Sequence, residues 1–320
     1  MSFSNRDIVC TRMTTFGTRM ILPAAVWRET ADAHRKRAEK HTLAARHRRD
    51  RGLPHPVADF LFEYYPFGFS LLEQWRPEVG IALVWDDAQQ ELSGRWKLLE
   101  NGCWFTDPGL LTEKEQLRLR WIVELLESTR DRLPNFACHG LHEWAMVYRG
   151  KEVRHENTLK LRLPQEEINA VVESQAICCS HHDAFRFFAS EARPLNHMQP
   201  TLESRVLLEQ PGCLHANMDL YKWAAKTMPW CGSDLLLDCF ELAVDLRNLD
   251  MRASPYDLSG WGLDAVRIET ADGRRAYESE QKALASRARP LRDRLIEVIG
   301  KTLEIARIRR SELDVCESML

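Results

Sequence analysis

The sequence lacks the features of a secreted or membrane-spanning protein. It has no run of about 18 consecutive apolar residues, which is the length that a membrane span needs. The first ten residues, MSFSNRDIVC, contain no apolar stretch followed by a small-residue cleavage site, so we expect no secretion signal. The nine cysteines are odd in number and form no CxxC pair, which argues against a disulfide framework or a zinc ribbon. We therefore expect reduced thiols and a cytoplasmic location.

Short motifs of several large enzyme classes are also absent. The chain has no GxxxxGK[ST], GxGxxG or GxSxG, which disfavours P-loop nucleotide hydrolases, Rossmann dehydrogenases and serine hydrolases. It contains HxxHE at 139–143 but not HExxH, and it lacks the HxE and PCxxC pair of zinc deaminases. Any chemistry must therefore come from a less common arrangement of side chains.

The small net charge of −3 conceals an uneven distribution along the 320 residues. Segments 28–51 and 274–310 have net charges of +5 and +6, whereas the central segment 52–273 has a net charge of −13. The basic flanks indicate either a phosphate-binding surface formed by the two ends or two helices whose charges face water. An acidic centre repels a polyanion unless the basic flanks dominate its entrance, which weakens the case for DNA and leaves a small cationic or planar substrate possible.

Periodicity and capping signals predict a mainly α fold, or α+β with a minor element of short strands, in one compact domain over residues 1–320. The capping box Thr112–Glu115 opens one helix, Ser233 is the expected N-cap of another, and a basic helix over 276–310 is kinked or split at Pro290. Residues 311–320 are expected to be a disordered tail. The other predicted helices are 24–50, which is also basic, 164–174 and 213–226, and the predicted short strands are within 80–85, 94–105 and 159–163.

Candidate catalytic groups come from the histidines, because seven of the eleven lie between residues 139 and 215. Three groups combine one of these histidines with a carboxylate close by in the sequence, and these groups could converge on one pocket as acid/base groups or ligands. Alternatively, each imidazole satisfies buried backbone groups in a helical core. The three groups are His142 with Glu143, His181 with Asp183, and His215 with Asp219.

Planar ligands are held by aromatic stacking, and several aromatic side chains flank these groups. The predicted substrate-binding residues are Trp144, Tyr148, Arg186, Tyr221 and Lys222. Lys222 also follows Asp219 by three positions, so an ion pair between them is expected if both lie on one helix. The aromatic segment 57–65 is expected to belong to the core.

Long stretches of the sequence, over about residues 20–300, resemble a family of bacterial proteins, common in actinobacteria, that are labelled 3-methyladenine DNA glycosylases. The similar stretches include HPVADFLFEYY (55–65), GLHEWAMVYR (140–149), CSHHDAFRFF (179–188), LEQPGCLHANMDLYKWAAK (208–226) and DCFELAVDLRNLDMRASPYDLS (238–259). The resemblance implies hydrolysis of the N-glycosidic bond of a cationic, damaged nucleobase in DNA. One of the three carboxylates would then stabilise the sugar cation, a histidine would position water, the aromatic residues would stack on the base, and Arg186 with the basic flanks would hold phosphate.

Two other functions remain open. A metal-dependent enzyme of helical fold would use His142, His181 and His215 as ligands of iron, manganese or zinc and would act on a small planar substrate. A non-catalytic protein would bind a nucleobase without turnover. The glycosylase hypothesis needs no cofactor, the metal hypothesis needs a divalent ion, and the expected partner is a nucleic acid or a nucleoside and not a membrane. The sequence gives no indication of the oligomeric state.

Overall fold

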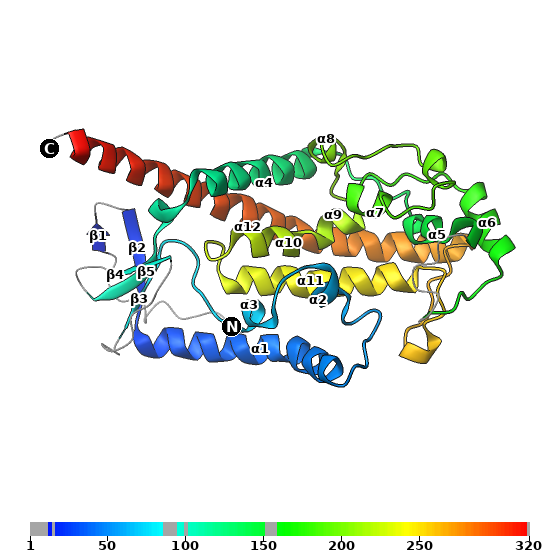
Figure 1. Ribbon diagram of the computed structural model, residues 1–320, viewed down its shortest axis with the longest axis horizontal. Helices are drawn as coiled ribbons and strands as arrows, with labels where there is room; N and C mark the ends of the chain where they lie inside the picture. The colour runs from blue at the N-terminus through cyan, green and yellow to red at the C-terminus, as the bar shows by residue number, and fades with distance from the viewer. Residues whose placement is uncertain (1–11, 15–16, 86–94, 99–101, 151–158, 319–320) are drawn as a thin grey trace.

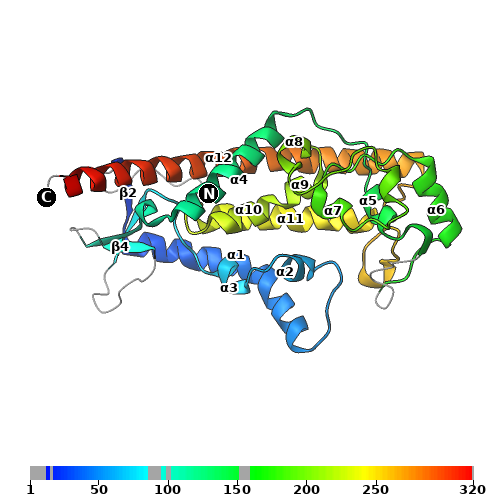
Figure 2. The ribbon, with the colours of Figure 1, turned by 45° about the horizontal axis from the view of Figure 1, so that its top comes forward.

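The computed structural model describes residues 12–14, 17–85, 95–98, 102–150 and 159–318; residues 1–10, where we expect no secretion signal, lie outside these ranges. The fold is mainly α with a small sheet, as the sequence predicts. Three long helices, α1 (Ala24–Asp50), α11 (Ser233–Arg252) and α12 (Ala271–Ser318), lie side by side along the long axis, with the sheet at one end (Figures 1 and 2). None of the described helices combines the length and apolar character that crossing a membrane requires.

Helix α11 lies at the centre of the bundle because it is apolar on more than one face. It buries side chains against α1, α10 (Leu220–Thr227) and α12. The residue before it is Gly232, with φ of 74°, and a Cβ there would lie 2.9 Å from the backbone nitrogen of Glu78. Glycine is therefore required at this position, and Gly232, not the predicted Ser233, is the N-cap. The Ser233 hydroxyl instead donates a hydrogen bond of 2.8 Å to the Gln74 carbonyl.

The outer helices follow the sequence signals closely. Helix α1 begins after Pro23 and buries His34, Ala38, Thr42 and Ala45, which are spaced to share one face. Helix α4 (Glu113–Asp131) begins at Thr112, and both hydrogen bonds of the predicted capping box with Glu115 are present. Helix α6 (Gln165–Ser174) lies within the predicted segment 164–174.

Helix α12 differs from the prediction at both ends and in the middle. It begins at Ala271, five residues before the predicted start, and it contains Pro290 without being split there. It also continues to Ser318, through most of the segment 311–320 that we expected to be a disordered tail. The sequence of this segment contains neither glycine nor proline, so nothing in it breaks a helix.

The sheet has the strand order β1-β2-β3-β5-β4 and a small apolar core of Ala82, Cys103 and Phe105. Strand β2 is parallel to β3 and the other neighbours are antiparallel, with Leu83 of β3 opposite Trp104 of β5. The predicted strand over 159–163 does not form; the segment makes only an isolated bridge between Leu161 and Tyr256. The strands are β1 (Arg12–Thr14), β2 (Gly17–Leu22), β3 (Ile81–Val84), β4 (Trp96–Leu98) and β5 (Cys103–Thr106).

Short helices and loops pack on the central bundle and carry most of the predicted site residues (Figure 1). The segment 213–226, predicted as one helix, forms α9 (Leu214–Met218) and α10, which meet at Asp219. The other short helices are α2 (Phe60–Tyr64), α3 (Phe69–Glu73), α5 (Leu141–Met146), α7 (His182–Phe185) and α8 (Arg205–Leu208), together with single turns at Pro108–Leu110, Tyr148–Gly150, Arg193–Leu195 and Ser259–Trp261.

Candidate functional site

The predicted catalytic residues surround a cavity of about 330 Å³. Five of the six predicted catalytic residues line it, although they come from three separate segments of the sequence. The sixth, His142, lies behind His215, with the two ring centroids 4.5 Å apart. The lining residues are Phe60, Glu63, Tyr64, Tyr65, Glu143, Met146, His181, Asp183, Ala184, Phe187, His215, Met218, Asp219 and Arg247.

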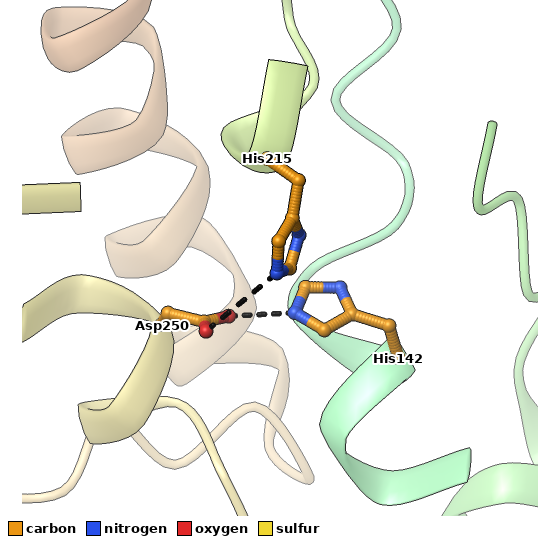
Figure 3. Close-up of side chains that lie close together, drawn as sticks. All are labelled: His142, His215 and Asp250. Atoms are coloured by element: carbon orange, nitrogen blue, oxygen red, sulfur yellow. Dashed lines mark hydrogen bonds and ion pairs between the residues drawn. The ribbon is translucent and has the colours of Figure 1, made fainter. Parts of the chain in front are cut away.

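One cluster at the cavity consists of His142, His215 and Asp250, which come from α5, α9 and α11 (Figure 3). The Nε2 atom of His142 lies 2.6 Å from Oδ1 of Asp250, and Nε2 of His215 lies 4.0 Å from Oδ2 of the same carboxylate. Helix α5 begins after Gly140, whose φ of 76° is left-handed and favours glycine. Because of this turn, His142 is the second residue of α5 and faces the end of α11.

Arg247 neutralises the carboxylates of this cluster. Its Nη1 atom lies 2.6 Å from Asp250 and 3.1 Å from Glu143, and all three side chains are buried. Burial alone would lower the pKa of His142, but the ionised Asp250 carboxylate holds it well above its usual value. Burial lowers the pKa of His215 to about 3, and the charged His142 ring beside it acts in the same direction. His215 is therefore a neutral imidazole at the cavity wall, and His142 is an imidazolium behind it.

A second cluster is centred on Asp219, which is also buried. Its Oδ2 atom lies 2.8 Å from Arg205 and 2.5 Å from Lys222, and its Oδ1 accepts a hydrogen bond of 2.7 Å from the Tyr65 hydroxyl. His181 lies 3.3 Å away through Nε2. Burial would raise the pKa of Asp219, but Lys222, His181 and Arg205 hold it well below its usual value. Asp219 is thus an ionised carboxylate fixed by its neighbours, and the predicted ion pair with Lys222 is present.

Asp183 is the more accessible carboxylate of this second cluster. Its side chain is 20% exposed, and its Oδ2 lies 3.1 Å from Lys222 and 3.5 Å from Arg205. Burial opposes ionisation, but Lys222 and His181 lower the pKa of Asp183 below its usual value. The two clusters meet at His181 and His215, whose rings are stacked with centroids 5.5 Å apart. The three histidine and carboxylate groups therefore converge, as the sequence analysis proposed.

The predicted binding residues are divided between the cavity edge and the protein core. Arg186 is exposed beside the cavity, with its Nε 3.7 Å from Asp183 and its guanidinium over the Phe187 ring. Trp144 is fully buried and donates a hydrogen bond to the Ala253 carbonyl, and Tyr148 donates one to Glu173. Tyr221 packs in the core against Tyr65 and Phe240.

The described lining of the cavity thus includes none of the three aromatic residues predicted to stack on a base, namely Trp144, Tyr148 and Tyr221. Phe60 and Tyr64 of α2, together with Phe187, take this place. The short helix α2 explains why these rings reach the cavity. It buries Leu61 and Phe62 in the core, whereas Phe60 and Tyr64, four positions apart, share a half-buried face. The expectation that the whole aromatic segment 57–65 belongs to the core was therefore wrong for these two rings.

Asp250 and Arg247 are the main site residues that the sequence analysis missed. Two charged neighbours of Asp250 in the sequence lie elsewhere, because Arg252 pairs with Glu280 and Asp257 caps Ser259. The missed signal is spacing on α11: Arg247 and Asp250 are three positions apart in a helix that is otherwise strongly apolar. Two buried charges on such a helix indicate an internal ion pair that faces other polar groups.

Comparisons with protein-family models, with curated protein sequences and with solved structures gave no match for the chain. The functional argument therefore depends on the residues and geometry of the site.

Proposed function

We propose that the protein is an N-glycosylase-type hydrolase that acts on a cationic, modified nucleobase bound in the cavity. The observation that carries this proposal is that aromatic rings and carboxylates line the same cavity. Tyr64 and Phe187 offer aromatic surface to a planar base, whereas Phe60 stacks on Tyr64 and lies under Arg247. Glu63 and Asp183, the lining carboxylates that are not buried, favour a positive charge on the bound base. A volume of about 330 Å³ is at the lower end of the range for small-molecule sites, which suits a single base with part of its sugar.

The reaction requires little activation of the leaving group, because a positively charged base leaves as a neutral molecule. The bond between the sugar C1′ and the base nitrogen breaks with its electron pair going to the base, and positive charge develops on the sugar. Asp183 is the carboxylate best placed to stabilise that charge, since it lines the cavity, is partly exposed and has a lowered pKa. Water then adds to C1′, and its proton passes to Asp183 and from there to bulk water.

Release of the base tests this proposal directly. The full-length protein is incubated with methylated duplex DNA and, separately, with the nucleosides 7-methylguanosine and 1-methyladenosine, and the free base is measured by mass spectrometry. We expect release from at least one of these substrates and a decrease of about 100-fold or more in Asp183→Asn. Glu167→Gln, an exposed carboxylate change on α6, is the matched control and should retain the full rate.

The form of the substrate follows from the same experiment, and a titration of the same nucleosides that measures binding distinguishes turnover from binding alone. Release from nucleosides but not from DNA would agree with the net negative charge of the central segment 52–273, which repels a polyanion. If the protein binds a nucleoside without releasing its base, and this binding weakens in Phe187→Leu, the protein would be a non-catalytic base-binding protein and not a hydrolase. Equal rates in the wild type and in both Asp183→Asn and Glu143→Gln would contradict the proposed chemistry.

A further inference from the structure

The side chains of His142, His215 and Asp250 form a compact set of donor atoms (Figure 3). One nitrogen from each imidazole and one carboxylate oxygen lie within 4.8 Å of one another, and the two rings approach the carboxylate from α5 and α9. An ion about 2.1 Å from each donor requires the donors to be no more than about 4.2 Å apart. Neighbouring donors around such an ion lie about 3.0–3.4 Å apart. Nε2 of His142 and Oδ1 of Asp250, now 2.6 Å apart, would therefore have to separate slightly, and His215, now 4.0 Å from the carboxylate, would have to move inward.

Two imidazoles and one carboxylate are a ligand set suited to a first-row divalent transition metal ion. Calcium and magnesium prefer oxygen ligands, so two imidazoles disfavour them. Because the set supplies three ligands in all, at least one coordination position would remain open. The sequence-level metal hypothesis used His142, His181 and His215. In the structure Asp250 takes the place of His181, because its carboxylate lies between His142 and His215.

The surroundings of this set resemble the outer shell of a metal site. Arg247 contacts Oδ2 of Asp250 and leaves Oδ1 directed at His142. The Nδ1 atom of His142 lies 3.5 Å from Sγ of Cys138, so the second nitrogen of the ring also has a partner. Contacts of this kind fix the orientation of ligands in known metal sites.

The other cluster of histidine and carboxylates is a poorer candidate. His181, Asp183 and Asp219 also place donor atoms within 4.8 Å of one another. However, Lys222 contacts both of these carboxylates and Arg205 contacts Asp219 at 2.8 Å, so two cations already occupy the positions that an ion would take. Around Asp250, Arg247 is the one Lys or Arg among the described ion pairs, and it is shared with Glu143. His142, the other close partner of Asp250, is itself one of the proposed ligands and would release its Nε2 proton when the ion binds.

We propose that His142, His215 and Asp250 bind one divalent transition metal ion, such as iron(II), manganese(II) or zinc(II), at the wall of the cavity. His215 itself lines the cavity, so an open coordination position would face the bound substrate. If the proposed hydrolase function holds, a water molecule bound there would be the one that adds to C1′. The binding of the ion does not depend on that function.

The test measures metal binding without reference to activity. Tag-free, chelator-treated full-length protein is titrated with Zn²⁺, Mn²⁺ and Co²⁺, and the stoichiometry is measured by calorimetry and elemental analysis. We expect one ion per chain and, for Co²⁺, visible absorption bands that report imidazole ligation. The affinity should decrease at least 100-fold in His215→Ala and in Asp250→Asn, with circular dichroism confirming that each variant is folded.

His181→Ala and His139→Ala are the matched controls and should retain the wild-type affinity. His181 stacks on His215 but lies outside the proposed set, and His139 pairs with Glu278 at the surface. Absence of stoichiometric binding would overturn the proposal, as would loss of binding in His181→Ala with retention in His215→Ala. Base release that is unaffected by chelation, together with one bound ion, would leave the site in place and remove only its catalytic role.

Discussion

Nε2 of His142 and Oδ1 of Asp250 form a hydrogen bond of 2.6 Å, although 108 residues separate the two in the sequence. Both side chains are buried, and the contact joins the first turn of α5 to the last turns of α11. Because Arg247 holds the other carboxylate oxygen, Asp250 is fixed from two sides. The candidate site is therefore part of the folded core, and its charges contribute to stability as well as to chemistry.

Removal of Arg247 should destabilise the protein strongly. Arg247→Met removes the cation that Asp250 and Glu143 share and leaves Glu143 without an arginine partner, and a loss of about 3–5 kcal/mol in the free energy of unfolding is expected. Urea unfolding followed by circular dichroism measures it. Arg287→Met is the control, because its ion pair with Asp245 is exposed and should contribute less than about 1 kcal/mol. Equal losses in the two variants would show that the buried pair is not special.

Two buried tyrosines should respond in opposite ways to the loss of their hydroxyl groups. Tyr65→Phe removes a hydrogen bond of 2.7 Å to the ionised Asp219, and we expect a loss of about 1.5–3 kcal/mol. The Tyr221 hydroxyl is buried without a hydrogen-bond partner in the described part of the chain, so Tyr221→Phe should be neutral or slightly stabilising. Thermal and urea unfolding of both variants test this contrast, and a large loss in Tyr221→Phe would show that the hydroxyl has a partner.

The sequence predicts the parts of this fold that local physics determines. Helix α4 begins where its capping box places it, and α1 extends over the predicted residues because glycine and proline are absent from them. The convergence of His142, His181 and His215 was also anticipated, since each has a carboxylate nearby in the sequence. These features depend on residues within a few positions of one another, which a single sequence displays directly.

Contacts between distant segments could not be predicted in this way. The spacing of Arg247 and Asp250 on α11 indicates an internal ion pair, but nothing local shows that Asp250 faces His142, which is far away in the sequence. In the same way, the pattern of α2 does not show that Phe60 faces a cavity while Phe62 faces the core. Which aromatic face is open depends on the helices packed against it, and this information comes only from the tertiary structure.

The pH dependence of stability should depend in part on Asp59, which lies outside the candidate site's two clusters. Burial would raise the pKa of Asp59, but hydrogen bonds from Arg48 and from the backbone N–H of His55 hold it below its usual value. Its folded pKa is therefore lower than its unfolded pKa of about 4. The stabilisation it provides is present above that pH and is lost as the pH falls through the folded pKa.

Asp59→Asn should remove this contribution, so that the free energy of unfolding decreases less steeply than in the wild type between about pH 4 and pH 2. Arg48→Met should reduce the slope in the same window, because Arg48 is the main cation that lowers the pKa. Urea unfolding at a series of pH values measures both slopes. If Asp59→Asn followed a profile parallel to that of the wild type down to pH 2, the carboxylate would not be the group that titrates, and the Arg48 contact would have to be weaker in solution than its geometry indicates.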